Sequence, residues 1–272
     1  MDERILKSLK KASWLDCLKE RKKPCSPLFD LPGVDNYTMK ADWMHAVDEG
    51  IAATICGNVL AELENLYPSL QKAERVADMW ADIRDLYQKF DVPPSSRLPK
   101  LSEKDIQKSG KQPELSGKAA HIRGLCPLLG DLAAAKLPAE GTPHQRAVRK
   151  LASYCSCMYQ SLEKAELSRM VKYGRLLKSQ WMALEDECLH LEDTLHWHSK
   201  PKLHLFDHII DAAVQGVDPR DNWCYADETF GFSLQGLFYR RGGKKNAGMD
   251  AERVMLGWMA AQDFPGLQKA DA

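Results

Sequence analysis

The 272-residue sequence contains no run of apolar residues that approaches the length of about 18 required for a transmembrane helix. Its first residues, MDERILKSLKK, are charged and lack an apolar stretch, so they do not resemble a secretory signal. Lys and Arg together number 38, as do Asp and Glu, and the formal net charge is zero. This balance argues against nucleic-acid binding through overall charge, but it allows a local basic patch.

The short motifs of several large enzyme classes are also absent. The sequence has no Walker loop, no nucleophile elbow, no kinase signature and no dinucleotide-binding fingerprint. The zinc-protease motif HEXXH is absent as well, because Leu205 and Phe206 follow His204. Enzymes whose chemistry depends on these motifs are therefore excluded.

Eight cysteines are spread irregularly, and most of them fall in segments with a helical pattern. Cys155 and Cys157 are too close together for a usual zinc knuckle, and there is no second pair of this kind. We expect free thiols, mostly buried as small apolar side chains, in a reducing compartment. The expected location is intracellular, either nuclear or cytoplasmic.

Hydrophobic residues make up 44% of the chain and recur at intervals of three and four, which is typical of amphipathic helices. The clearest stripe predicts one long helix before Pro68 and consists of Met44, Val47, Ile51, Ile55, Val59, Leu63 and Leu66. Further helices are expected over about 1–23, 69–90, 117–135, 143–165, 177–195, 202–216, 228–240 and 249–261. We find no strand pattern, so the predicted fold class is mainly α, a multi-helix bundle.

Local signals predict where several helices begin. Ser69 is the expected N-cap of the second helix, and Thr142 followed by Pro143 is expected to begin another. Ser102 with Asp105 suits a capping box of one short helix.

The chain is expected to have three parts. Residues 1–40 form an N-terminal helix and a Pro-rich connector, and 41–241 form a helical domain. Within that domain, the polar segment 91–118 is expected to be a flexible loop, and 242–272 form a basic turn and a final helix.

Asp42 and His45 open the long predicted helix, and their spacing of three places both side chains on one helical face. The pair has two interpretations. The carboxylate and the imidazole act together chemically, or Asp42 caps the helix and His45 is its neighbour.

His204 and His208, the last members of a histidine-rich segment, are four residues apart and also share a helical face. Such a pair can bind a metal ion, and Asp207 and Asp211 lie nearby in the sequence. The alternative is that both histidines form hydrogen bonds in a contact between helices.

Asp227 and Glu228 stand at the expected start of a helix, where the helix dipole favours acidic residues. A carboxylate at such a position is also suited to Mg²⁺. A two-metal nuclease site requires at least two converging carboxylates, because hard divalent cations are held by oxygen ligands. A single catalytic carboxylate here would therefore not be sufficient.

A basic patch surrounds two glycines after this helix and consists of Arg240, Arg241, Lys244 and Lys245. The patch is suited to contacts with DNA phosphates. It also fits a solvated helix C-terminus, where cations are favoured by the helix dipole.

Two groups of motifs together resemble part of the eukaryotic cut-and-paste transposases. Residues 26–33 (SPLFDLPG), 42–50 (DWMHAVDEG) and 57–60 (GNVL) are similar to the segment around the D-x-x-H motif of the CACTA and hAT types. Residues 202–210 (KLHLFDHII) and 223–230 (WCYADETF) are similar to the end of their helical insertion and the helix with the last catalytic acid.

This resemblance implies an RNase H-like core with three catalytic acids, interrupted by a helical insertion that corresponds to residues 46–200. It implies that Glu228 is the last acid and that Asp42 and His45 form the D-x-x-H motif. The first two acids would precede Asp42 on strands, but no strand pattern is found there. We therefore expect a catalytically incomplete, transposon-derived protein that uses no cofactor, and Mg²⁺ only if the missing acids were supplied.

The expected partners are DNA, a second copy of this chain or another transposase chain, and no membrane. Two other hypotheses stay open. One is a helical protein–protein interaction module unrelated to transposition, and the other is a metal-binding protein built on the histidines.

Overall fold

A computed structural model describes residues 40–107, 110–193 and 195–225. All regular structure within these ranges is helical and no strand occurs in them, which confirms the mainly α fold class. In the same ranges, no helix combines the length and the apolar character needed to cross a bilayer. The helices expected over 1–23, 228–240 and 249–261 lie outside the described residues.

Contacts divide the chain into two compact units, Met1–Asn222 and Trp223–Ala272. The boundary expected between residues 241 and 242 lies within the second unit. The helices from residue 44 to residue 222 all belong to the first unit.

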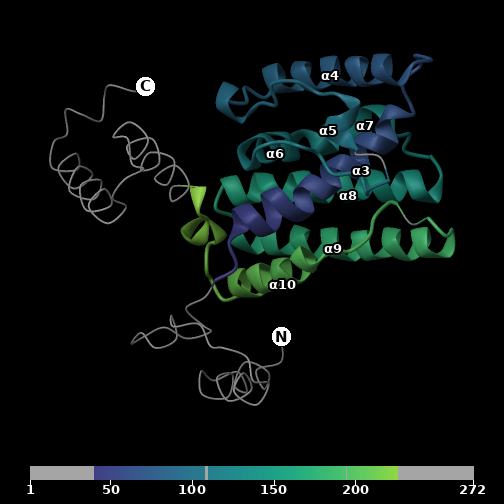
Figure 1. Cartoon of the computed structure of the whole chain (residues 1–272). Coiled ribbons are helices and arrows are strands. Elements are labelled where there is room, and N and C mark those ends of the chain that lie inside the picture. The colour runs from purple at the N-terminus through teal and green to yellow at the C-terminus, as the bar shows by residue number, and fades with distance from the viewer. Residues whose placement is uncertain (1–39, 108–109, 194, 226–272) are drawn as a thin grey trace, which may run out of the picture. The chain divides into compact units, whose positions relative to one another are not determined.

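The long helix predicted before Pro68 is present, but its first part is a π-helix. The π-helix η2 (Met44–Ala52) continues directly into α3 (Ala53–Glu64). The apolar stripe is buried as far as Leu63, whereas Leu66 lies beyond the helix and is exposed. Because α3 contacts α4, α5, α6, α7 and α8, it has almost no exposed face (Figure 1).

The second helix, α4 (Lys72–Lys89), begins later than predicted. Ser69 is not its N-cap; the cap position is Gln71, and the Ser69 hydroxyl instead donates to Asp78 at 2.9 Å. The Arg75 guanidinium donates to the carbonyls of Ser69 and Leu70, and these bonds hold the segment outside the helix.

The segment 91–118, expected as a flexible loop, contributes buried side chains to the unit: Leu98, Leu101, Ile106 and Leu115. It contains a 3₁₀ turn, η3 (Pro94–Ser96), and a short helix, α5 (Glu103–Ile106). The capping box of Ser102 and Asp105 is confirmed at the start of α5.

The helix expected over 117–135 is interrupted at Pro127. It forms α6 (Ala119–Leu125), the 3₁₀ turn η4 (Cys126–Leu128) and α7 (Leu129–Lys136). A proline lacks the backbone N–H required inside an α-helix, so the break follows from the sequence.

The helices expected over 143–165 and 177–195 are present, and they form a helical hairpin. Its first helix, α8 (Pro143–Glu163), starts with the predicted cap: Thr142 Oγ1 accepts a hydrogen bond from the Gln145 N–H at 3.1 Å. Its second helix, α9 (Leu167–His190), packs along α8. The turn between them contains Ala165, which has a φ of 58°.

Gly174 lies inside α9, which begins before the helix expected over 177–195. The helix that packs on it is α10 (Pro201–Val214), whose Ile210 and Phe206 side chains approach Gly174 most closely. Gly216, with a φ of 87°, follows α10, and the 3₁₀ turn η5 (Pro219–Asn222) completes the unit. In Figure 1, α8, α9 and α10 lie one beneath the other, with α4 on the opposite side of α3.

Gly57 and Asn58 attach two distant segments to α3. A Cβ atom at Gly57 would clash with the backbone nitrogen of Glu114, so only glycine allows this approach. The buried Asn58 amide donates to the Pro113 carbonyl and accepts from the Trp197 N–H, both at 3.3 Å. The segment that contains residues 113 and 114 therefore packs directly on the central helix.

We predict that Gly57→Ala lowers the free energy of unfolding by at least about 1 kcal/mol, because the new methyl group displaces the backbone of residues 113 and 114. The clash outweighs the gain of about 1 kcal/mol that alanine brings to a helix interior. Urea denaturation measures the change, with Gly117→Ala as the control, since a Cβ there meets only side-chain atoms at 3.3 Å or more. Equal effects of the two substitutions would contradict the close packing.

Candidate functional site

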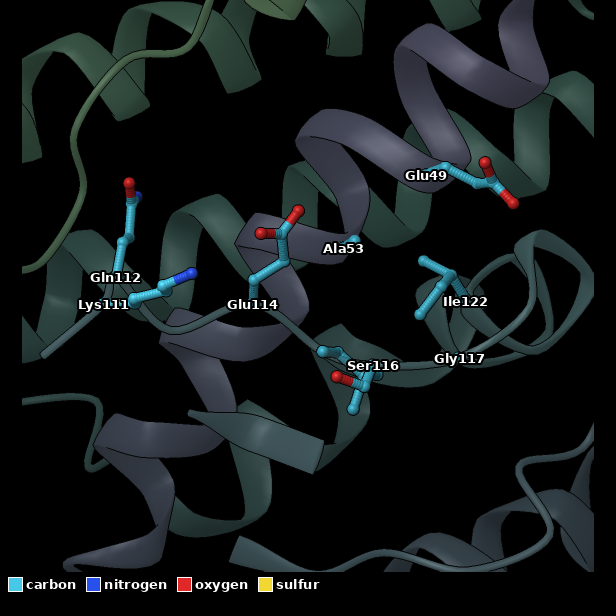
Figure 2. A pocket seen from close by; sticks show the side chains of 9 residues that line it. Glu49, Ala53, Lys111, Gln112, Glu114, Ser116, Gly117 and Ile122 are labelled. Carbon is cyan, nitrogen blue, oxygen red and sulfur yellow. The ribbon is translucent and has the colours of Figure 1, made fainter. Parts of the chain in front are cut away.

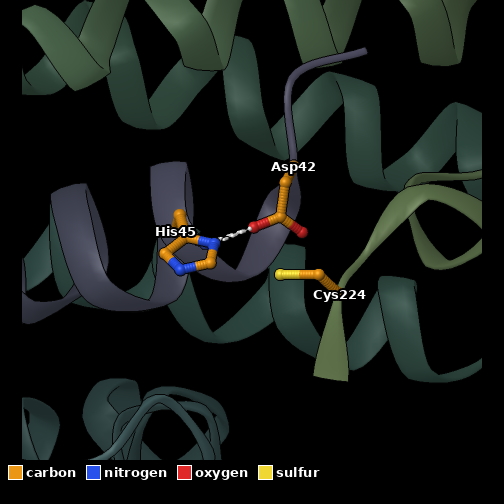
Figure 3. A group of neighbouring side chains, drawn as sticks. All are labelled: Asp42, His45 and Cys224. Carbon is orange, nitrogen blue, oxygen red and sulfur yellow. Dashed lines mark hydrogen bonds and ion pairs between the residues drawn. The ribbon is translucent and has the colours of Figure 1, made fainter. Parts of the chain in front are cut away.

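Asp42 and His45 lie at the start of η2, and their hydrogen bonds are those of a helix cap. The Asp42 carboxylate accepts from the backbone N–H of His45 at 2.7 Å and from its ring Nδ1 at 2.6 Å. Figure 3 shows this pair at the first turn of the helix; Cys224, which is also labelled, belongs to the second compact unit. The predicted meeting of carboxylate and imidazole is thus present, with an imidazole that is about half exposed.

The π-helix places a carboxylate in the core. Hydrogen bonds in a π-helix span five residues, so side chains five positions apart lie on one face. The Trp43 indole Nε1 consequently donates to Asp48 Oδ1 at 3.1 Å, and both side chains are fully buried. In an ordinary α-helix, the facing neighbours are three or four positions apart, and this pair would diverge.

Tyr159 of α8 completes the environment of Asp48. Its hydroxyl donates to the same Oδ1 atom at 2.5 Å, and its ring packs edge-on against Trp43. Burial and the neighbouring carboxylate raise the pKa of Tyr159 well above its usual value, so the phenol stays protonated and remains a donor. The position of Asp48 next to the apolar stripe is a signal in the sequence for a buried carboxylate. Its partner on α8, Tyr159, was not predictable from the sequence.

Three buried cysteines adjoin this carboxylate, as expected for free thiols in a helical core. Cys56 and Cys126 have their sulfur atoms 3.7 Å apart, and Cys155 hydrogen-bonds to Cys126. Hydrogen bonding to Cys126 and burial raise the pKa values of Cys56 and Cys155. These two thiols are therefore protonated near neutral pH and poor nucleophiles.

The start of α10 packs on η2, although 153 residues separate the two contacting positions. The Lys202 ammonium group donates to the Glu49 carbonyl at 2.9 Å. A Cβ atom at Gly50 would lie 2.5 Å from Lys202 Cδ, so the absence of a side chain at Gly50 makes room for the lysine stem. Segments 42–50 and 202–210, two of those on which the resemblance to transposases rests, are therefore neighbours in the fold.

A cavity of about 500 Å³ lies between the η2–α3 helix and the segment 111–117 (Figure 2). Glu49 stands on one side of it, and Lys111 and Glu114 stand on the other. The Glu114 carboxylate forms an ion pair with Lys200 at 2.8 Å. Because the lining charges are mixed and partly compensated, the cavity favours neither an anion nor a cation.

His204 and His208 meet as their spacing predicts. Their Nε2 atoms are 3.1 Å apart and their ring centroids 4.5 Å apart. Two other histidines of the segment bond to local partners instead: His190 to the Asp186 carbonyl and His196 to the Asp193 carboxylate. The structure thus pairs His204 with His208. His190 and His196 instead bond to Asp186 and Asp193, which lie close to them in the sequence.

A second histidine site, at His144, was not apparent from the sequence. Its Nε2 lies 2.8 Å from the Glu62 carboxylate of α3, and its Nδ1 lies 3.0 Å from the Glu187 carboxylate of α9. The hydrogen bond to Glu62, supported by Glu187, raises the pKa of His144 to about 9. The charged imidazolium therefore joins three helices, and no local pattern identifies partners so far away in the chain.

The remaining predicted site residues lie outside the described part of the chain. They are the acidic pair Asp227 and Glu228 and the basic patch of Arg240, Arg241, Lys244 and Lys245. Their roles in metal and DNA binding stay predictions. In the second unit the structure describes residues 223–225, where the rings of Trp223 and Tyr225 pack edge to face at 5.6 Å.

Comparison with known proteins found no matching family, no matching curated protein and no matching solved structure. The similarity to transposases stays a prediction from the sequence motifs at residues 26–60 and 202–230.

We predict that His144 makes the stability of the protein dependent on pH. A pKa raised in the folded state contributes stability that is fully present below the unfolded value of about 6.5 and is lost as the pH rises through about 9. Urea unfolding of the wild type and of His144→Gln should therefore differ most near pH 6. The difference should shrink as the pH approaches 10.

The matched control is His190→Gln, since the His190 ring bonds to the Asp186 carbonyl of its own helix. A gap between wild type and His144→Gln that stays constant from pH 6 to pH 10 would show that the imidazolium is not responsible.

Proposed function

We propose that this chain is a transposase-derived helical protein that lacks a complete catalytic site and acts by binding DNA or another protein chain. Its described helical unit corresponds, in this proposal, to the insertion within a transposase core. The observation that carries the proposal is the contact between η2 and α10 through Gly50 and Lys202.

An inserted domain must leave and re-enter its host fold at neighbouring points, which is why insertions succeed where the ends of a domain lie close together. The predicted insertion, residues 46–200, starts inside η2 and ends immediately before α10. Because Lys202 contacts both Gly50 and the Glu49 carbonyl, the two ends of the segment meet. This arrangement meets that requirement of the insertion hypothesis.

Two acids of the first unit near these ends have structural roles, which supports catalytic incompleteness. Asp42 caps η2 through the His45 N–H, and Asp48 is fully buried with hydrogen bonds from Trp43 and Tyr159. A two-metal site requires converging carboxylates that a divalent ion can reach. Glu228 would therefore need further acids to complete such a site.

The binding role is assigned to the basic patch of Arg240, Arg241, Lys244 and Lys245, whose charges suit phosphate contacts. We predict that the full chain binds duplex DNA more tightly at low salt, and that replacing these four residues by glutamine weakens binding and flattens its salt dependence. The slope of log K against log salt decreases by roughly 0.9 for every phosphate that the variant no longer neutralises. Fluorescence anisotropy with labelled DNA measures both quantities.

The control replaces four exposed or partly exposed basic residues of the first unit, Lys104, Lys118, Lys150 and Arg175, and so removes the same charge. If both quadruple variants weaken binding equally, the patch has no special role. If the wild type does not bind DNA at low salt, the protein-interaction alternative is favoured.

We further predict that the purified chain does not cleave DNA in the presence of Mg²⁺ or Mn²⁺, because a single candidate acid, Glu228, cannot hold two metal ions. A gel assay with supercoiled plasmid tests this. Cleavage by the wild type that Glu228→Gln abolishes would contradict the proposed incompleteness, whereas cleavage unchanged by that substitution would indicate a contaminating nuclease.

A further inference from the structure

Two imidazole rings on α10 form a pair to which the proposed function assigns no role. His204 is exposed and His208 is partly exposed. The residues of α10 that pack into the core are others: Leu203, Phe206, Ile209, Ile210 and Ala213. Since side chains four positions apart on a helix are neighbours, the pair is held on one regular helix and is accessible from solvent.

The distance between the two nitrogen atoms matches the bite of a metal chelate. Zn²⁺ binds imidazole nitrogen at about 2.0–2.1 Å, so two nitrogens on one ion with an angle between about 90° and 110° are separated by about 2.9–3.4 Å. The two Nε2 atoms are 3.1 Å apart. A single ion can therefore bind both with little movement of the rings.

We propose that His204 and His208 form a two-histidine chelate for a divalent transition-metal ion of the Zn²⁺ and Ni²⁺ class. Without metal, one Nε2–H donates to the other Nε2. When the ion binds, that proton moves to Nδ1 of its own ring through solvent, and both Nε2 lone pairs coordinate the metal. Neutral imidazole favours Zn²⁺, Ni²⁺ and Cu²⁺ over Mg²⁺ and Ca²⁺, which prefer oxygen ligands.

The helix keeps this geometry fixed before the metal arrives. Phe206 and Ile210 of α10 pack against Gly174 of α9. The Asp207 carboxylate of α10 forms an ion pair with Lys178 of α9. These contacts set the rotation of α10, so the two rings stay together on the solvent side. Asp211, seven positions after His204, adds negative charge on the same face by helical periodicity.

Water is expected to fill the other coordination positions, because the pair supplies two ligands. Because only two protein atoms hold the ion, its affinity for the site is moderate. A partner molecule can supply a further ligand to the same ion. The chelate does not depend on the proposed transposase origin, since it rests only on contacts within α10 and between α10 and α9.

Isothermal titration of the full chain with ZnCl₂ and with NiCl₂ tests the proposal. We expect binding of both ions, and a loss of affinity of at least about tenfold in His204→Gln and also in His208→Gln. His190→Gln is the matched control, because His190 bonds to the Asp186 carbonyl of its own helix. Circular dichroism confirms that each variant is folded.

A second measurement separates this site from any other that binds zinc. With selectively labelled histidine, the ring resonances of His204 and His208 should shift together on addition of Zn²⁺ and stay unchanged with Mg²⁺. Wild-type affinity in either glutamine variant, or no shift of both resonances with Zn²⁺ in millimolar excess, would overturn the chelate.

Discussion

The packing of the Lys202 side chain on Gly50 is the contact that joins the two ends of the described helical unit. It is possible because residue 50 has no side chain, and because the Glu49 carbonyl accepts a hydrogen bond from the lysine ammonium group at 2.9 Å. Besides η2, α10 also packs on α9, the second helix of the hairpin. The proposal of an inserted domain depends on this closure.

The π-helix η2 explains how the same short segment also supports the core. Its wider turn brings Trp43 and Asp48 onto one face, and Tyr159 of α8 reaches the same carboxylate oxygen. A buried carboxylate is costly unless it is well hydrogen-bonded, so these donors must be in place when the helices pack. The polar cluster therefore fixes where η2 and α8 meet, while Lys202 fixes where η2 and α10 meet.

Much of the fold could be predicted from the sequence where the signals are local. Thr142 and Pro143 mark the start of α8, and Pro127 marks the break before α7, because capping and the missing N–H act within a few residues. The π-helix was not predictable, since Met44, Val47 and Ile51 fit the intervals of three and four residues that are typical of an α-helix. The two histidine sites were predictable only in part. The pairing of His204 with His208 follows from helical spacing, whereas the hydrogen bonds of His144 depend on helices that come together only on folding.

The central claim is that the two ends of the helical unit meet at Gly50 and Lys202. Nuclear Overhauser spectroscopy on protein labelled selectively at glycine and lysine tests it most directly. A cross-peak between the Gly50 α-protons and the Lys202 δ-protons is predicted, because a Cβ at Gly50 would lie 2.5 Å from Lys202 Cδ. Absence of that cross-peak, in a sample where cross-peaks within α10 show that the helix is formed, would contradict the account.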